Sequence, residues 1–348
     1  MACDSVPPEG RVVPRIRLAT LRLAALMTYG LLCVAIAASA DAETVTFAGR
    51  PSNLVVPASY DPGTPAPLIV LLHGYGVTGA NQESYMGFSA LANEFGFLFI
   101  NPDGKEGYVG GPQYWNATDA CCDIYPEHPD DSGYVRGLID TLRADYNIDD
   151  RRIFITGHSN GGFMSYRMAC DHADVVAAIA SLAGATYNVP AACSPSEPVD
   201  VLQIHGTLDG TISFSGGSMP FFPFPIYPGA VASVQTWNQY NGCTNTEDVS
   251  APNLDLDSGL AGAETTVTRY TDGCSPGGSG ELWRIQAGGH IPALNGNYAR
   301  GVVEYFYAHP KLADPAVPAL PSAAHALALA CLLGATALAA TRHRRRGR

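Results

Sequence analysis

The sequence around Ser159 has the residue types of a serine nucleophile held on a tight turn. The run Arg152 to Gly162 reads Arg-Ile-Phe-Ile-Thr-Gly-His-Ser-Asn-Gly-Gly, so a short apolar segment leads directly into Gly-x-Ser-x-Gly. A serine hydroxyl is a weak nucleophile until a base and backbone N–H groups surround it, and a strand-to-helix turn exposes it to both. Gly157 and Gly161 leave room for that turn, and the helix-compatible segment Phe163 to Cys170 follows. The spacing predicts nucleophilic attack by Ser159 on an acyl carbon.

An acid and a histidine follow Ser159 in the chain order that this kind of turn usually shows, which is serine, acid, histidine. The apolar run Val199 to Gly206 leads into Asp209. We expect Asp209 to hold the histidine in one tautomer and to stabilise its charged form. Further on, Leu282 to Gln286 precedes Gly288-Gly289 and then His290, which we expect to be the general base.

Three other residues compete for these roles. His73 and His205 also stand beside glycine at the ends of strand-like runs. His73 comes before Ser159 in the chain, and His205 comes before Asp209 in the same segment. Neither follows both other members, so the expected order favours His290. Asp200 competes with Asp209, but it stands at the start of its strand, away from the carboxyl edge where such sites form. An isolated aspartate after a strand is often only a cap or turn residue, and chain order is what favours Asp209.

Two backbone N–H groups are expected to bind the oxyanion of the tetrahedral intermediate. The apolar run Pro67 to Leu72 ends in His73-Gly74-Tyr75-Gly76, a glycine-rich loop at a strand end. The candidates are the N–H of Tyr75 in this loop and the N–H of Asn160, directly after the nucleophile. Removing one such donor from an enzyme typically costs about 3 kcal/mol of transition-state stabilisation.

Taken together, these segments resemble the secreted α/β-hydrolase esterases that include polyhydroxybutyrate depolymerases and feruloyl esterases. The resemblance covers about 260 residues, Phe47 to His309, and rests on His73-Gly74, Trp115-Asn116 followed by Cys121-Cys122, Asp131 to Val135, Gly157 to Gly162, Ile204 to Asp209, Asn241-Gly242-Cys243 and Gly288 to His290. It implies the same three roles for Ser159, Asp209 and His290. It also implies that Trp115 lines the substrate pocket.

The segment Ser218 to Pro228 is the most informative about the substrate. It interleaves four prolines with the aromatic residues Phe221, Phe222, Phe224 and Tyr227. Proline lacks the N–H and restricts φ, so neither a central strand nor a helix can form here, and a stiff aromatic surface loop is expected. The three phenylalanines are candidates for binding a hydrophobic substrate. The alternative is that the rings cover the core or the pocket mouth as a structural lid.

Both ends of the chain indicate export. Arginines precede the apolar stretch Leu23 to Ala38, and Ala40-Asp41-Ala42 offers a small-x-small cleavage site, so residues 1–42 are predicted to be a signal peptide. Residues 313–322 are predicted to be a proline-rich linker. Residues 323–348 combine an apolar run of about bilayer length with a basic end, which predicts a sorting tail, with a plain single-pass anchor as the alternative. A secreted, periplasmic or cell-surface protein follows, with membrane contact through this tail alone and a sorting or processing protease as a partner.

The charge of the remaining chain restricts its partners. Residues 43–322 contain 11 lysines and arginines against 29 aspartates and glutamates, a net charge of −18. Nucleic acid binding needs basic patches, so nucleic acid is excluded as a partner. A neutral ester, including a polymeric one, suits this surface. No sequence pattern calls for a cofactor or a metal.

Six cysteines lie between the two ends, an even number that agrees with export to an oxidising compartment. They are Cys121, Cys122, Cys170, Cys193, Cys243 and Cys274. Six cysteines allow 15 connectivities, and the sequence alone does not choose among them. Proximity and the family resemblance favour Cys170 with Cys193 and Cys243 with Cys274. The adjacent Cys121 and Cys122 are left as a vicinal bond or a free pair. A zinc site is the alternative, but no Cys-x-x-Cys spacing supports it.

A single α/β domain is expected over residues 43–312, with a mostly parallel sheet covered by helices on both faces. The expected strands are Leu54–Val56, Leu68–Leu72, Phe97–Ile100, Ile153–Thr156, Ala177–Leu182, Val201–Ile204 and Leu282–Ile285. The expected helices are Gln82–Asn93, Gly133–Tyr146, Gly161–Cys170, Ala230–Tyr240 and Asn297–Ala308. The long loop Gly104–Asp130, which carries Trp115, is expected to wall the pocket.

The sequence therefore predicts a secreted serine carboxylic-ester hydrolase that works through an acyl-enzyme. A polyhydroxyalkanoate-type polyester or a related hydrophobic ester is the expected substrate. One alternative is a feruloyl or acetyl esterase acting on plant polysaccharide. A second is a catalytically silent surface protein that binds an apolar ligand on a hydrolase frame, and a third is an acyltransferase with the same three residues.

Overall fold

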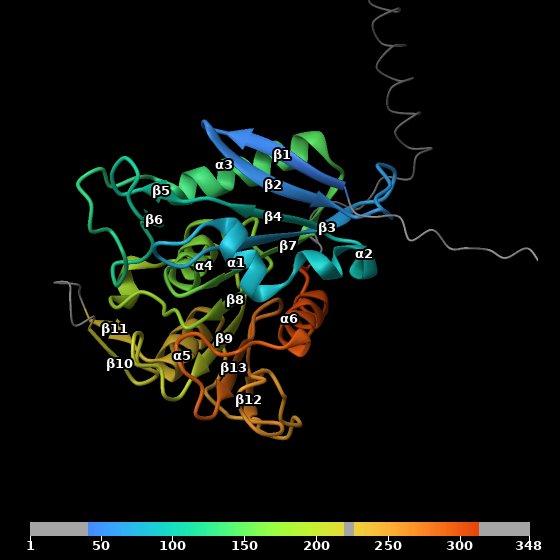
Figure 1. The fold of residues 1–348 in the computed structure, drawn as a ribbon. Helices are drawn as coiled ribbons and strands as arrows, with labels where there is room; N and C mark the ends of the chain where they lie inside the picture. The colour runs from blue at the N-terminus through green and yellow to red at the C-terminus, as the bar shows by residue number, and fades with distance from the viewer. Residues whose placement is uncertain (1–40, 219–225, 313–348) are drawn as a thin grey trace, which may run out of the picture. The chain divides into compact units, whose positions relative to one another are not determined.

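A nine-stranded sheet forms the centre of the computed structural model, which describes residues 41–218 and 226–312 (Figure 1). Its order is β1-β2-β4-β3-β7-β8-β9-β13-β12, and the six strands from β4 to β13 run parallel to one another. The strands are β1 (Asp41–Phe47), β2 (Arg50–Val56), β3 (Ala66–Leu72), β4 (Leu98–Pro102), β7 (Ile148–His158), β8 (Ala178–Leu182), β9 (Asp200–Gly206), β12 (Thr265–Tyr270) and β13 (Gly280–Ile285). The predicted α/β-hydrolase fold with a mostly parallel sheet is confirmed.

The central strands are apolar along their whole length because both faces of the sheet are covered. In β3, Leu68 and Val70 enter the hydrophobic cluster on one face, whereas Ile69 and Leu71 enter the cluster on the other. All four side chains are fully buried. This alternation explains why β3 reads as a continuous apolar run, as expected for a parallel strand between two helical layers.

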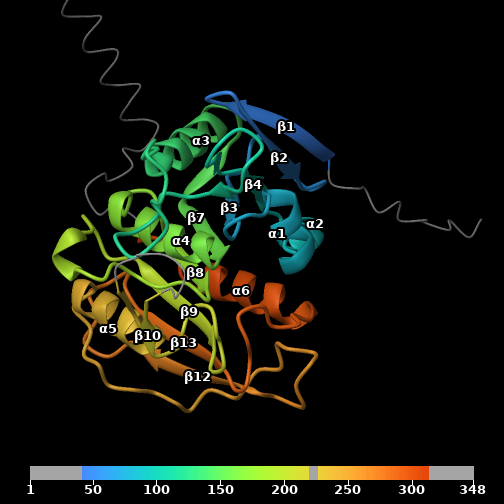
Figure 2. The same cartoon turned by 60° about the vertical axis from the view of Figure 1, so that its left-hand side comes forward.

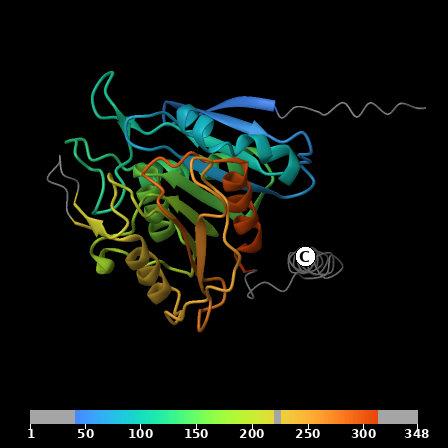
Figure 3. The ribbon, with the colours of Figure 1, turned by 60° about the horizontal axis from the view of Figure 1, so that its bottom comes forward.

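Two layers of helices enclose the sheet, as predicted. Side chains of α3 (Asp131–Asp145), α4 (Asn160–Asp171) and α5 (Ala230–Tyr240) join the cluster on one face. Side chains of α1 (Gly79–Met86), α2 (Ala92–Phe95) and α6 (Gly296–Ala308) join the cluster on the other. Figure 2 separates the two layers, and Figure 3 shows α5 and α6 on opposite sides of the strands. Short 3₁₀ turns lie at Ser89–Leu91 and Pro190–Ala192, and two-residue strands pair β5 (Lys105–Glu106) with β6 (Gln113–Tyr114) and β10 (Gly216–Gly217) with β11 (Tyr227–Pro228).

The structure differs from the sequence-based expectation at one helix and two strands. The segment expected as one helix over Gln82–Asn93 is divided, because Gly87 adopts a left-handed conformation with φ 75° and ends α1. The edge strands β1 and β12 were not predicted. β12 reads Thr-Thr-Val-Thr-Arg-Tyr, so it is mostly polar and contains no apolar run of the kind used to find the central strands.

The predicted targeting segments lie largely outside the described residues. These are the signal peptide, except for Asp41 and Ala42 at the start of β1, the whole linker, and the whole tail. Phe221, Phe222 and Phe224 also lie outside them. Within residues 41–218 and 226–312, no helix combines the length and apolar character needed to cross a membrane.

Candidate active site

Ser159 lies at a sharp turn between β7 and α4. Its φ of 54° and ψ of −119° place it in a region that non-glycine residues rarely adopt. The flanking residues must be glycines because neighbouring backbone atoms lie too close to leave room for a Cβ atom. A Cβ atom on Gly157 would lie 2.4 Å from the carbonyl carbon of Gly161, and one on Gly161 would lie 2.1 Å from the carbonyl oxygen of Leu72. The strained turn presents the hydroxyl at the carboxyl edge of the parallel strands, as a nucleophile elbow does.

His290 lies in the loop between β13 and α6, which brings its ring beside Ser159. Its Nε2 is 3.0 Å from Oγ of Ser159, and its Nδ1 is 2.8 Å from Oδ2 of Asp209. Because Nδ1–H donates to the carboxylate, Nε2 is left to accept the hydroxyl proton. His158 supports this loop, since its Nε2–H donates to the carbonyl oxygen of His290 at 2.8 Å. Burial, reinforced by the neighbouring His290, lowers the pKa of His158 to about 4, so it remains a neutral donor.

Asp209 follows β9 and has a fully buried carboxylate with several donors around it. Its Oδ1 accepts from the backbone N–H groups of Thr211 and Ile212, each at 2.8 Å. Its Oδ2 lies 3.3 Å from Nε2 of His205 in addition to its contact with His290. Burial by itself would raise the pKa of Asp209, but the hydrogen bonds from His205 and His290 outweigh it and hold the pKa well below its usual value. Asp209 is therefore ionised at neutral pH, as an orienting acid must be.

The competing residues are occupied elsewhere. His73 is fully buried, donates from Nδ1 to the carbonyl oxygen of Gly74 and accepts at Nε2 from the N–H of Gly104, both at 2.8 Å. Its burial lowers its pKa to about 4. Asp200 lies at the amino end of β9, where its Oδ1 accepts from the hydroxyl of Ser279 at 2.5 Å. The third rival, His205, lies behind Asp209, with its Nε2 2.8 Å from the carbonyl oxygen of Ile212 and 3.3 Å from Oδ2 of Asp209. The structure therefore brings Ser159, His290 and Asp209 together and gives all three rivals structural partners.

The two candidate oxyanion donors lie in the loops that flank Ser159. Tyr75 is in the loop between β3 and α1, and Asn160 is the first residue of α4, where the helix leaves its initial N–H groups unpaired. Within the described residues, neither backbone N–H donates a hydrogen bond to another backbone atom or side chain. The positive end of the α4 dipole also favours negative charge at this position.

Trp115 does not lie where a substrate would reach it. Its side chain is fully buried, and its ring packs at 5.0 Å from the ring of His73 and at 6.4 Å from that of Tyr134. Its Nε1–H donates to the carbonyl oxygen of His73 at 3.0 Å. The expectation that Trp115 lines the substrate pocket is therefore wrong for this structure. A tryptophan in a long loop has the same sequence signature whether it faces a ligand or the core.

Exposed apolar side chains gather around the site, a feature that the sequence reading did not anticipate. Leu208 and Ile291 are 70% and 68% exposed and lie directly beside Asp209 and His290 in the chain. Tyr75 and Tyr108 are 38% and 63% exposed, and Tyr125 links them through a hydroxyl contact of 2.6 Å to Tyr75 and a ring contact to Tyr108. We call Tyr75, Tyr108, Leu208 and Ile291 the apolar rim.

All six cysteines of the domain form disulfide bonds in the structure. The pairs are Cys170–Cys193, Cys243–Cys274 and the vicinal pair Cys121–Cys122. The first two connect the partners that the family resemblance favours. The third shows that the adjacent residues Cys121 and Cys122 form a vicinal bond and are not a free pair. Cys121 also lies against the site, because its sulfur accepts from Nδ2 of Asn160 at 3.7 Å.

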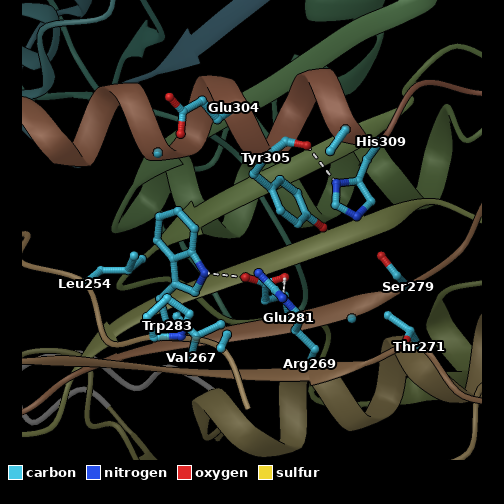
Figure 4. Close-up of a pocket in the computed structure, with 15 residues that line it drawn as sticks. Leu254, Val267, Arg269, Thr271, Ser279, Glu281, Trp283, Glu304, Tyr305 and His309 are labelled. Atoms are coloured by element: carbon cyan, nitrogen blue, oxygen red, sulfur yellow. Dashed lines mark hydrogen bonds and ion pairs between the residues drawn. The ribbon is translucent and has the colours of Figure 1, made fainter. Parts of the chain in front are cut away.

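A separate cavity of about 430 Å³ lies between β12, β13 and α6. Figure 4 shows Trp283 and Tyr305 among its walls, together with the ion pair between Arg269 and Glu281. The indole N–H of Trp283 donates to the same carboxylate at 2.6 Å. None of Ser159, Asp209 and His290 lines this cavity. Arg269 and Glu281 are thus partners within the cavity wall, whereas Glu304 lies 4.0 Å from Arg300 outside it.

Part of the chain that carries this site is similar to a known protein family. A phospholipase/carboxylesterase family model matches residues 54–220, which include the oxyanion loop, Ser159 and Asp209. The matched segment is thus similar to this esterase family, and the sheet around it has the α/β-hydrolase fold. Among solved structures, an acetyl xylan esterase from Aspergillus awamori superposes with a TM-score of 0.52 and 17% identity, covering 77% of this chain and 99% of that one. At this identity the likeness shows the fold alone.

Two curated relatives of this chain are more similar to it in sequence. Feruloyl esterase B of Piromyces equi is 28% identical over 67% of this chain and 41% of its own length. Poly(3-hydroxyalkanoate) depolymerase C of Paucimonas lemoignei is 30% identical over 60% of this chain and 53% of its own length. The match spans about half of these relatives, so their names bear on this chain only as support for a proposal.

Proposed function

We propose that this α/β-hydrolase is a serine carboxylic-ester hydrolase that works through an acyl-enzyme. The observation that carries the proposal is the continuous contact from Ser159 through His290 to Asp209, at 3.0 and 2.8 Å. Each group has the partner that its role requires: a base for the hydroxyl, and an ionised acid for the base. The pairing of nucleophile and base within hydrogen-bond reach is the geometric criterion for such chemistry.

In the proposed reaction, Oγ of Ser159 attacks the ester carbonyl while Nε2 of His290 takes its proton. The N–H groups of Tyr75 and Asn160 bind the oxyanion of the tetrahedral intermediate. The intermediate collapses, and the leaving alkoxide departs as an alcohol with the proton from His290. Water then attacks the acyl-enzyme with His290 again as base, and the carboxylic acid is released as the serine regains its proton.

The apolar rim supports a hydrophobic ester, and we propose a polyhydroxyalkanoate-type polyester as the substrate. Large exposed apolar side chains around a site indicate contact with an apolar partner. Leu208 and Ile291 each stand one residue from a member of the proposed triad, so the acyl or alcohol part would meet them directly. The strongly acidic chain disfavours a highly anionic substrate and is compatible with a neutral ester.

A feruloyl or acetyl ester on polysaccharide is the second candidate, and the tyrosines near the oxyanion loop favour it. Tyr125 contacts Tyr75, Tyr108 and Tyr114, with ring centroids 6.4 and 4.7 Å apart for the latter two. Such a cluster could hold an aromatic acyl group. Incubation with polyhydroxybutyrate film, methyl ferulate and acetylated xylan would rank the candidates. Release of ferulate without attack on the film would overturn the polyester proposal.

The serine mechanism is tested by Ser159→Ala, with Ser132→Ala as a matched control. Ser132 is also a buried serine beside an aspartate and a histidine, 2.7 Å from Asp171 and 3.0 Å from His172. We expect Ser159→Ala to lose turnover of p-nitrophenyl butyrate and labelling by a fluorophosphonate, and Ser132→Ala to keep both. Turnover retained in Ser159→Ala would overturn the mechanism. If the wild type binds ligand without turnover and without labelling, the chain is the catalytically silent binding protein. If it transfers the acyl group to an added alcohol in preference to water, it is the acyltransferase.

We further propose export by the N-terminal signal and tethering or processing through the C-terminal tail. The disulfides of the domain support an oxidising compartment. Fractionation of cells that express the full chain, followed by mass determination of the mature protein, tests both segments. Retention in the cytoplasm with an intact N-terminus would contradict the proposal.

A further inference from the structure

The side chain of Asn160 and the backbone of Trp115 form a reciprocal pair of hydrogen bonds. The N–H of Trp115 donates to Oδ1 of Asn160 at 2.8 Å, and Nδ2 of Asn160 donates to the carbonyl oxygen of Trp115 at 2.9 Å. Both residues are at most 1% exposed. An amide is required for this pairing, because a carboxylate could accept the first bond but could not donate the second.

The same short segment also holds the loop on the other side of the site. The indole N–H of Trp115 donates to the carbonyl oxygen of His73, and the N–H of Gly76 donates to the carbonyl oxygen of Gln113 at 2.8 Å. These two bonds flank Tyr75 on both sides in the chain. Residues 113–115 thus contact the loop of one proposed oxyanion donor and the residue that provides the other.

We propose that Trp115 is a positioning residue that sets the separation between the N–H groups of Tyr75 and Asn160. The inference rests on the proposed function, since it concerns the oxyanion of that reaction. Preorganised donors stabilise an oxyanion because they need no rearrangement when the charge develops. A buried brace that ties β3, β6 and α4 together supplies this preorganisation, and loss of the indole N–H would also leave the buried carbonyl of His73 without that donor.

The test is Trp115→Phe, which keeps a buried aromatic ring and removes the indole N–H. The chain offers a matched control in Trp237→Phe. Trp237 is also fully buried and packs against Tyr166 of α4, but its Nε1–H donates to Oγ1 of Thr186 at 2.8 Å, so this hydrogen bond holds neither Asn160 nor the loop of Tyr75. Both variants lose one buried indole hydrogen bond, so a similar decrease in melting temperature is expected for each.

The readouts are kcat, KM and inhibition by an alkyl boronic acid, which binds Ser159 as a tetrahedral adduct. We expect Trp115→Phe to lower kcat by about 10- to 100-fold, which is less than complete loss of one donor causes. KM should stay within about twofold, and the boronic acid Ki should rise by a factor comparable to the loss in kcat. Trp237→Phe should leave all three values close to wild type. Asn160→Leu keeps the backbone N–H of residue 160 and adds no charge, but it removes both side-chain hydrogen bonds to Trp115. It should lower kcat and raise the boronic acid Ki while KM stays nearly unchanged, and it serves as the test if Trp115→Phe does not fold.

Two outcomes would overturn the inference while leaving the proposed function intact. One is an equal loss of kcat in Trp115→Phe and Trp237→Phe, which would indicate a general packing effect. The other is a raised KM with unchanged kcat and unchanged boronic acid Ki in Trp115→Phe. Absence of ester turnover and of fluorophosphonate labelling in the wild type would overturn the proposed function and this inference together.

Discussion

Replacement of Asp209 by asparagine should invert the tautomer of His290, and the structure fixes the direction of this change. The N–H groups of Thr211 and Ile212 each lie 2.8 Å from Oδ1 of Asp209. In Asp209→Asn, the amide oxygen must face these two donors, so the amide nitrogen faces His290. Nδ1 of His290 must then accept a hydrogen bond, and its proton moves to Nε2, the atom that faces Ser159 at 3.0 Å.

The expected loss is large because the base is then in the wrong form. With a proton on Nε2, His290 cannot take the hydroxyl proton of Ser159, although every atom remains close to its original place. In serine proteases the equivalent change lowers kcat by about 10⁴-fold. At about 1.4 kcal/mol for each factor of ten, this corresponds to about 5 to 6 kcal/mol of transition-state stabilisation.

The assay compares kcat/KM for p-nitrophenyl butyrate at neutral pH with Asp200→Asn as the control. Asp200 is a buried aspartate on the same strand, and burial raises its pKa, so a neutral amide is tolerated there. We expect Asp200→Asn to remain within a few-fold of wild type and Asp209→Asn to stay folded by circular dichroism. Activity within tenfold of wild type in a folded Asp209→Asn protein would refute the tautomer argument.

Three further predictions concern stability. Burial lowers the pKa of both His73 and His158 to about 4, whereas an imidazole in the unfolded chain has a pKa of about 6.5. The unfolded chain therefore binds more protons between about pH 6.5 and pH 4, and the unfolding free energy should fall as pH decreases through this window. The expected slope is up to about 1.4 kcal/mol per pH unit for each imidazole. Urea titrations across pH should show this slope, and His158→Gln should reduce it. Gly161→Ala should abolish soluble expression, because its Cβ would lie 2.1 Å from a β3 carbonyl oxygen; a folded variant would contradict the close approach. Cys170→Ser should lower the unfolding free energy by about 2 to 4 kcal/mol by freeing Cys193, and an unchanged urea midpoint would contradict this.

The sheet and the candidate triad could be predicted because each depends on local pattern and chain order. Strands such as β3 and β9 are buried on both faces, so they appear as apolar runs without alternation. Parallel strands place their following loops at one edge, so Ser159, Asp209 and His290 are expected to lie together once their strands are known. The interval between Asp209 and His290 is irrelevant to this argument, since β9 and β13 are neighbours in the sheet.

The remaining features depend on tertiary contacts that leave no distinct mark in the sequence. Gly87 ends α1 through its left-handed backbone, although the surrounding residues are compatible with a longer helix. Trp115 is buried, and its indole N–H has its partner in the carbonyl oxygen of His73, 42 positions away in the chain. The apolar rim comes from separate loops, so Leu208 and Ile291 read as isolated exposed residues until the fold brings them to the same edge. Composition alone cannot distinguish these cases.

The buried network behind Asp209 explains why this carboxylate, among the 32 acidic residues of the chain, has the environment of a catalytic acid. Nε2 of Gln203 faces the carbonyl oxygen of Gly184 at 2.9 Å, which fixes the orientation of the amide, and it also donates to Nδ1 of His205 at 3.0 Å. His205 therefore carries its proton on Nε2, which donates to the carbonyl oxygen of Ile212 at 2.8 Å and also lies 3.3 Å from Oδ2 of Asp209. The hydroxyl of Tyr166 donates to Oε1 of Gln203 at 2.8 Å and starts this chain in the core. A second chain of donors comes from the other side of the site. The hydroxyl of Ser159 donates to Nε2 of His290, and Nδ1–H of His290 donates to Asp209. Both chains end on the same carboxylate, so the fold stabilises a negative charge at the one position where an imidazolium has to be balanced during turnover.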